Sequence, residues 1–372
     1  MLRSPATGRA LTLQGHAMTA PGERWPVIDG IAFLRADRRA LADAALTRLD
    51  AGDTEAALVL LLGDQDNWAR TPPPTEAARL DAIRNRATLS FRAAMDRLAF
   101  GPVGTYFAHR WSDPTFLSGL ALAQAYWGAP RHVLELACGA GHYLRAFAGH
   151  AETVTGGDLV FAKLWLARHW VAPQATLVCF DAAVAWPFAD RAADLLFCHD
   201  AFYFLPEKPR VAAEMLRVAR RILVGHMHNA LVDNLSAGEP LEPANYAALF
   251  PAPDLFDDRE LTAALVEGRV PCKAIAAELA NAPAVALAVG TGAPGVAAGP
   301  LTVASAGTRL QRNPLYVDQR IHWPSERYER EYGPLATYPE HSDAPDEATA
   351  GSGVWIDALA RRRELVDLPE RW

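Results

Sequence analysis

The sequence contains few cysteines, and their spacing excludes the common cysteine-based frameworks. Only four of the 372 residues are cysteine, and no two of them form a CxxC pair. We therefore expect neither a disulfide framework nor a structural zinc site built from paired cysteines. The pattern suits a reducing cytoplasm, where we expect the protein to act. It favours a role as small buried side chains for Cys138, Cys179, Cys198 and Cys272.

An excess of basic charge and a continuous apolar segment are also missing. The formal net charge is -7, whereas proteins that bind nucleic acids usually present a basic face, so we expect no nucleic-acid partner. The N-terminal residues lack the apolar core of a secretion signal. One uncharged stretch, residues 281–308, is interrupted repeatedly by Pro and Gly. It predicts short buried strands and turns rather than a membrane helix, so no membrane partner is expected.

The composition that remains is typical of a globular enzyme-sized chain, with 51% hydrophobic and 21% charged residues. We expect a flexible tail (1–23), an N-terminal hairpin with a helical addition (24–104), an α/β core (105–230) and a C-terminal part (231–372). Asp29-Gly30 favours a hairpin turn. Thr75 is expected to cap one long helix with Leu80, Ile83, Phe91, Met95 and Leu98 facing inward.

Strand-like and helix-like segments alternate in the core. The expected strands are 133–136, 153–158, 176–180, 194–198 and 222–227, and the expected helices are 141–148, 161–170 and 209–220. This alternation predicts a parallel sheet with helices on both faces. On such sheets ligands bind beyond the carboxyl ends of the strands, which directs attention to the residues that follow each strand.

The strongest motif is the segment Glu135-Leu136-Ala137-Cys138-Gly139-Ala140-Gly141, where a buried strand turns into a helix. Glycines let the backbone pass close to a ligand, and a helix start offers free N–H groups. Asp158 ends the next strand, at the spacing expected of a ribose-binding acid. A dinucleotide-binding turn would have a third glycine where this chain has Leu144, which disfavours a Rossmann oxidoreductase.

The same segment resembles motif I of class I S-adenosylmethionine-dependent methyltransferases, of the small-molecule, type 11-like kind. Four further segments resemble that family in order and spacing: Asp181-Ala182 with Trp186-Pro187-Phe188, the strand 194–200, Phe202 to Leu205, and Glu214 to Val218. The resemblance implies a doubly wound, mostly parallel, seven-stranded Rossmann-like sheet. It implies S-adenosylmethionine as the cofactor, with a C-terminal cap over the substrate.

The resemblance also assigns cofactor contacts. Glu135, Gly139 and Gly141 would surround the methionine part, and Asp158, with Leu159 beside it, would hold the ribose. The pair Asp181 and Ala182 would meet the adenine edge. Tyr106 or Arg110, which precede the first core strand, would meet the methionine carboxylate.

Polar residues after the fourth and fifth core strands are the candidates for chemistry. His199 and Asp200 are expected beside the transferred methyl group, so His199 is also expected to contact the cofactor. His226 and His228 alternate on one strand and should share a face. A histidine base could take the acceptor's proton, and Asp200 could orient it. No metal is predicted, because no third ligand for the histidine pair is evident.

These features predict methyl transfer to O or N of a small-molecule metabolite by in-line displacement. A second hypothesis is a non-catalytic, S-adenosylmethionine-binding scaffold that serves another enzyme. The identity of the acceptor is left open at this point, and so is homodimer formation.

Overall fold

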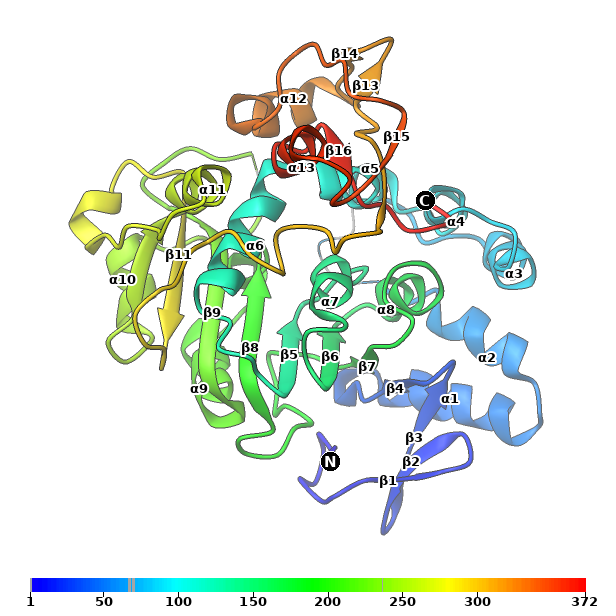
Figure 1. The fold of residues 1–372 in the computed structure, drawn as a ribbon. Helices are drawn as coiled ribbons and strands as arrows, with labels where there is room; N and C mark the ends of the chain where they lie inside the picture. Colours follow the sequence, from blue (N-terminus) through cyan, green and yellow to red (C-terminus); the bar gives the residue numbers. More distant parts are fainter. Residues whose placement is uncertain (1, 66–67, 69–70, 236) are drawn as a thin grey trace.

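A computed structural model describes residues 2–65, 68, 71–235 and 237–372 as a mixed α/β structure around one large sheet (Figure 1). The sheet has eleven strands in the order β1-β2-β3-β4-β7-β6-β5-β8-β9-β11-β10. Its central strands are parallel. The prediction of an α/β fold with a large, mostly parallel central sheet is confirmed.

The five strands expected in the core are all present. They are β5 (His132–Leu136), β6 (Thr153–Asp158), β7 (Thr176–Cys179), β8 (Ala193–His199) and β9 (Ala219–His228). Two C-terminal strands complete this part of the sheet. β11 (Ala284–Val289) pairs antiparallel with β9, and β10 (Asp254–Asp257) pairs antiparallel with β11. All six residues of β11 are buried, as its continuous apolar sequence requires.

The N-terminal segment extends the sheet beyond the seven expected strands. It forms β1 (Thr12–Gln14), β2 (Ala17–Ala20), β3 (Glu23–Ile28) and β4 (Ile31–Phe33), and β4 pairs in parallel with β7. The hairpin predicted at Asp29-Gly30 joins β3 to β4. The expectation of a flexible tail over residues 1–23 is wrong for β1 and β2. Strands of three and four residues are too short to show a period in the sequence. They are fixed by pairing, because β2 pairs with β3 and β1 pairs with β2.

The helical addition differs from the expectation in one place. Its helices are α1 (Arg39–Asp50), α2 (Thr54–Leu61), α3 (Glu76–Asn85), α4 (Phe91–Arg97) and α5 (Gly101–His109). Thr75 caps α3 as predicted, but the long helix expected after it is two helices. Ser90 has extended backbone, and its hydroxyl accepts from the Ala93 N–H, so the chain starts a new helix there.

The remaining helices flank the sheet or cover its end. They are α6 (Pro114–Ala125), α7 (His142–Phe147), α8 (Phe161–Leu166), α9 (Lys208–Val218), α10 (Pro243–Ala248), α11 (Asp258–Glu267), α12 (Glu326–Tyr332) and α13 (Val354–Arg361). Small ladders are formed by β12 (Arg309–Arg312), β15 (Glu347–Thr349) and β16 (Leu365–Val366), and by β13 (Tyr316–Val317) with β14 (Arg320–Ile321). Figure 1 shows α12 and α13 beyond the carboxyl ends of β5, β6 and β8.

Two further sequence expectations concern membrane-spanning helices and the cysteines. In the described part of the chain, no helix combines the length and apolar character needed to cross a membrane. Cys138, Cys179 and Cys198 are buried as expected, whereas Cys272 is exposed and therefore does not fill the core.

The core beneath the site is built around Phe197 of β8, which is fully buried. Its ring lies 4.8 Å from that of Tyr143 and 5.2 Å from that of Phe147, both in α7. Aromatic pairs at such distances add to the stabilisation that burial provides. Phe197 therefore links the sheet to the helix that follows the glycine turn.

We expect Phe197→Ala to lower the free energy of unfolding by about 3–5 kcal/mol, because it leaves a cavity between β8 and α7. Urea denaturation followed by circular dichroism measures this. Leu13→Ala is the control, since Leu13 is 58% exposed, and should change stability by less than about 0.5 kcal/mol. Equal losses in the two variants would contradict this account of the core.

Candidate active site

A cavity of about 1020 Å³ lies at the carboxyl ends of the core strands. We call it the central cavity. It brings together the glycine turn after β5, the end of β6, the end of β8, helix α5, the N-terminal addition and α12. The predicted site residues that line it are Tyr106, Arg110, Glu135, Gly139, Asp158, Leu159, Asp181, Ala182, His199 and Asp200. Segments far apart in the sequence therefore meet at the edge where a ligand was expected.

Asp158 joins the glycine turn to the loop after β6. Its carboxylate accepts from the Gly139 N–H and from the Val160 N–H, each at 2.9 Å. The Lys163 ammonium lies 3.9 Å away. Gly139 has a φ of +54°, and a Cβ there would lie 3.1 Å from the Phe107 ring. This position needs glycine for its backbone conformation and for its narrow surroundings.

Gly141 does not face the central cavity, although it was expected to surround the cofactor. It has a φ of +87°, and a Cβ there would lie 3.1 Å from the Cβ of Ala167 and 3.3 Å from that of Ala172. It is not among the residues that line the cavity. Its lack of a side chain instead lets α7 begin close to the π-helical segment Ala167–Val171 that follows α8. The motif showed where the turn is but not which way each glycine faces.

Glu135 carries a buried oxygen that has no protein partner. It lines the central cavity, is 3% exposed, and its Oε2 makes no hydrogen bond within the described structure. Burial raises the pKa of its carboxyl group well above the usual range. An unpaired buried acceptor costs free energy unless a ligand supplies a donor. Glu135 therefore fits a cationic or N–H group of a bound ligand.

The N-terminal addition supplies cavity residues that sequence reasoning missed. Arg35 is 2% exposed and donates to the Leu159 carbonyl at 2.6 Å and to Asp64 at 3.1 Å. Asp37 and Arg38 line the same part of the cavity. No local signal marks these residues as part of the site, because the contact that joins Arg35 to the core, with Leu159, spans more than a hundred positions of sequence.

Asp200 is held by two tyrosines on the cavity wall. Tyr106 donates to its Oδ2 at 2.6 Å, and Tyr203 donates to its Oδ1 at 2.7 Å. Burial alone would raise the pKa of Asp200, but the nearby charges of His226 and Arg110 outweigh it and lower the pKa. Its φ of +54° is uncommon for a residue with a side chain. Asp200 is thus an ionised carboxylate at the cavity wall.

Arg110, expected to meet the methionine carboxylate, is already engaged within the protein. It is buried and donates to Asp113 Oδ2 at 2.7 Å and to the Thr115 hydroxyl. Its guanidinium also lies 3.7 Å from Asp200 Oδ2. It nevertheless lines the cavity, so part of its side chain borders the space that a ligand would occupy.

His199 lines the cavity but is packed as a core histidine. Its Nε2 lies 2.9 Å from the Thr115 carbonyl, so this nitrogen carries the hydrogen. Its Nδ1 faces two glycines, since a Cβ on Gly225 or Gly119 would lie 2.4 or 2.7 Å from it. Burial lowers the pKa of His199 to about 3. The local structure therefore disfavours this residue as a base near neutral pH.

His226 and His228 lie behind the cavity wall and are not among its lining residues. Their rings are 5.2 Å apart, which agrees with the expectation of a shared face. His226 Nδ1 lies 2.8 Å from Asp258 Oδ2. Burial opposes the charged form of His226, but Asp258 and Asp200 raise its pKa to about 9. Burial lowers the pKa of His228 to about 4.

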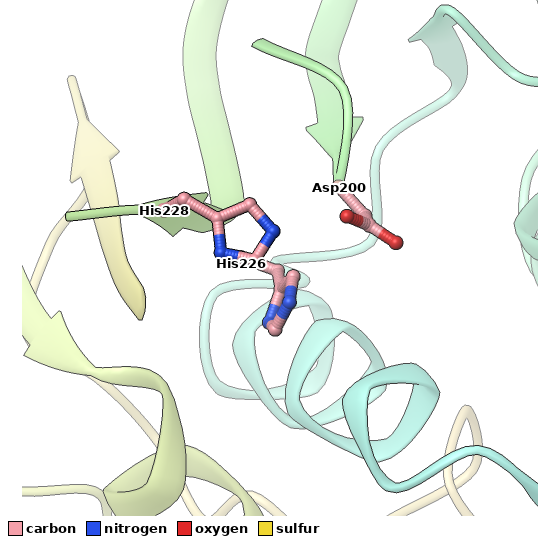
Figure 2. Close-up of side chains that lie close together, drawn as sticks. All are labelled: Asp200, His226 and His228. Atoms are coloured by element: carbon pink, nitrogen blue, oxygen red, sulfur yellow. The ribbon is translucent and has the colours of Figure 1, made fainter. Parts of the chain in front are cut away.

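The fold brings a third polar group to this histidine pair. One ligand atom from each of Asp200, His226 and His228 lies within 4.8 Å of the others, as Figure 2 shows for the three side chains. No metal is predicted from the sequence, because a third ligand is not evident there. The structure supplies this third group, since the turn after β8 places Asp200 beside the end of β9.

Comparison with known proteins assigns the core to a family. Residues 134–222, from β5 into β9, match the model of the "Methyltransferase domain" family. This segment is a class I S-adenosylmethionine-dependent methyltransferase domain, and S-adenosylmethionine is its cofactor. The match lies within the part of the chain where the motifs were recognised. No curated protein matches the chain.

Several solved structures are similar to parts of the chain. The YcgJ protein of Bacillus subtilis is 22% identical over 36% of this chain and 66% of its own, with a TM-score of 0.31. A Haemonchus contortus phosphoethanolamine N-methyltransferase 2 is 16% identical over 54% of this chain and 60% of its own, with a TM-score of 0.37. A Thermotoga maritima SAM-dependent methyltransferase is 14% identical over 52% and 96%, with a TM-score of 0.36. This chain spans less than two thirds of the first two.

We expect Gly139→Ala to weaken S-adenosylmethionine binding by at least tenfold, because the new Cβ enters the turn at the Phe107 ring and disfavours its φ. Isothermal titration calorimetry measures the change. Gly149→Ala is the matched control, since it has a φ of +84° and open space around the Cβ. It should lose similar stability but keep its affinity. Equal affinity losses in both variants would contradict a local role for Gly139.

Proposed function

We propose that the chain transfers a methyl group from S-adenosylmethionine to an oxygen or nitrogen of a small-molecule metabolite bound in the central cavity. The main support is that one cavity of about 1020 Å³ connects the glycine turn with α12. Ligand pockets are commonly about 300–1,000 Å³, so this volume leaves room for cofactor and acceptor together. The cap residues come from outside the matched domain, where acceptor specificity would then reside.

The cofactor end is assigned to the residues around β5, β6 and β7. Glu135 would accept from the methionine ammonium through its unpaired oxygen. Gly139 leaves the backbone accessible, and Asp158 would accept from the ribose while it holds the turn. Leu159, Asp181 and Ala182 line the part of the cavity expected to take the adenine.

The acceptor end is assigned to the aromatic side chains around Asp200. Tyr106 and Tyr203 both donate to this carboxylate, and Tyr332 of α12 lies with its ring 6.3 Å from that of Tyr106. The carboxylate can exchange a tyrosine hydroxyl for an O–H or N–H of the acceptor, which would orient the attacking atom. S-adenosylmethionine supplies a methyl group that is already activated. The protein's remaining task is alignment and exclusion of water.

We assign no histidine as a general base in this mechanism. The Nε2 of His199 is used by the Thr115 carbonyl, and His226 and His228 do not reach the cavity surface. Approach of the two reactants within an aromatic-lined cavity can supply much of the rate enhancement without a base. Asp200 acts here as an orienting hydrogen-bond acceptor.

Isotope transfer tests the proposal as a whole. The purified chain is incubated with methyl-labelled S-adenosylmethionine and separated metabolite, protein and nucleic-acid fractions of a cell extract. Label in the metabolite fraction, with release of S-adenosylhomocysteine, is the expected result. Label in the protein or nucleic-acid fraction would overturn the choice of a small acceptor. Tight cofactor binding with no transfer to any fraction would instead support the non-catalytic scaffold.

We expect Tyr332→Ala to raise the KM for the acceptor roughly tenfold, equivalent to about 1.4 kcal/mol of lost contact. The Kd for S-adenosylmethionine should change less than about twofold, because the cofactor end is formed by other elements. Steady-state kinetics and calorimetry measure the two quantities. Arg330→Ala, on the exposed side of α12, is the control and should change neither. A loss of cofactor affinity in Tyr332→Ala would place α12 at the cofactor end of the cavity and contradict this assignment.

A further inference from the structure

We propose that Asp200, His226 and His228 form a binding site for a divalent transition-metal ion where β8 and β9 end. Each offers one ligand atom, and the three atoms lie within 4.8 Å of one another (Figure 2). Imidazole nitrogens with one carboxylate oxygen are a ligand set that suits Fe²⁺, Co²⁺ and Zn²⁺. Three protein ligands leave further coordination positions for a water or a substrate atom.

The spacing of the three ligand atoms is close to what such an ion requires. Metal–nitrogen and metal–oxygen bonds of about 2.0–2.2 Å place neighbouring ligand atoms about 3.0–3.5 Å apart. The observed atoms would therefore need to close by at most about 1–2 Å around an ion of this kind. The Asp200 carboxylate would turn toward the ion by exchanging one of its two tyrosine hydrogen bonds for the metal bond, and a rotation of the His228 side chain would complete the closure, while His226 stays held by Asp258.

The strongest second observation is the partner of His226. Its Nδ1 lies 2.8 Å from the buried carboxylate of Asp258, at the start of α11. Metal-binding histidines commonly donate the other ring N–H to a carboxylate, which fixes the tautomer and raises the basicity of the ligand nitrogen. Here the pairing uses Nδ1 and leaves Nε2 for an ion. Tyr106 and Tyr203 orient the Asp200 carboxylate in a similar way.

The backbone also departs from regular geometry at two of the three ligands. Asp200 has a φ of +54° and His226 a φ of +47°, both in the region that residues with side chains seldom adopt. The register of β9 against β11 shifts at the same place, between the pairs Val224–Leu287 and Met227–Val285. Such bulges and strained residues concentrate at functional sites, where they redirect side chains.

The surrounding charges can accommodate a divalent cation. Asp200 and Asp258 supply two carboxylates, both of them close to His226. Arg110 lies 3.7 Å from Asp200 Oδ2 and opposes a cation, but Asp113 at 2.7 Å balances that guanidinium.

The position of the site gives it a use in catalysis. Asp200 lines the central cavity, so an ion bound to its carboxylate lies at the wall of the acceptor end. An acceptor hydroxyl that completes the coordination would be oriented and would lose its proton more easily. This use rests on the proposed function, whereas the metal site itself does not.

Cobalt titration of the full-length chain tests the site. The protein is stripped with EDTA, and Co²⁺ binding is followed by its visible d–d absorption and by calorimetry. We expect one Co²⁺ per chain, displaced by Zn²⁺. His228→Gln and Asp200→Asn should weaken binding at least about 100-fold, and Asp258→Asn about 10–100-fold, because it only positions His226. His132→Gln, at the opposite end of the sheet, is the control and should bind as the parent does.

Two outcomes would overturn the site: no stoichiometric Co²⁺ binding by the parent chain, or unchanged binding in both His228→Gln and Asp200→Asn. Thermal melting shows whether each variant is folded. If Asp200→Asn is unfolded, Co²⁺ binding by a folded His228→Gln variant alone tests the site. S-adenosylmethionine binding is measured in the same samples without metal. Binding of Co²⁺ but not of S-adenosylmethionine would reject the proposed function and keep the metal site. Binding of S-adenosylmethionine but not of Co²⁺ would reject the metal site and leave the proposed function standing.

Discussion

The carboxylate of Asp158 is the contact on which the arrangement of the site depends. It accepts hydrogen bonds from the Gly139 N–H and the Val160 N–H, so it fixes the turn after β5 against the turn after β6. Each turn follows a buried parallel strand, and its N–H group would otherwise lack a partner. One carboxylate therefore accepts hydrogen bonds from both loops and leaves the space beside them open. The cavity exists because the loops are held by each other and not by a side chain inserted between them.

Local signals in the sequence were sufficient for the elements around that contact. The apolar strands, the glycine turn and the acid that ends β6 are each encoded within a few residues, and the structure has them where they were expected. The family resemblance could therefore be recognised from order and spacing. The same locality explains why the motif does not show that Gly141 lies away from the cavity lining. The motif shows that position 141 has no side chain. Only the packing of Ala167 and Ala172 against it shows that these two residues, and not a ligand, occupy the space beside it.

Features that depend on distant contacts were missed for a physical reason. Arg35 contacts Leu159 because the N-terminal segment extends the sheet, and this extension begins with strands of three and four residues. The residues next to Arg35 in the sequence do not indicate this contact. The third group beside His226 and His228 was missed in the same way. Asp200 and the histidine pair end neighbouring strands, and their closeness follows from the parallel pairing of β8 with β9 and from the turn at each end.

The charges behind the acceptor end form one alternating chain. Asp113, Arg110, Asp200, His226 and Asp258 follow one another from the start of α6 to the start of α11, with measured separations of 2.7 Å, 3.7 Å and 2.8 Å at three of the four steps. A buried charge is costly alone, and removal of one partner from such a pair costs about 3–5 kcal/mol. Alternation gives each of the three inner charges an opposite charge on both sides, which offsets the cost of burying it. A metal ion bound at His226 would occupy a cationic place in this order of charges. The network that stabilises the ends of β8 and β9 is therefore the same one that makes the position suitable for a cation.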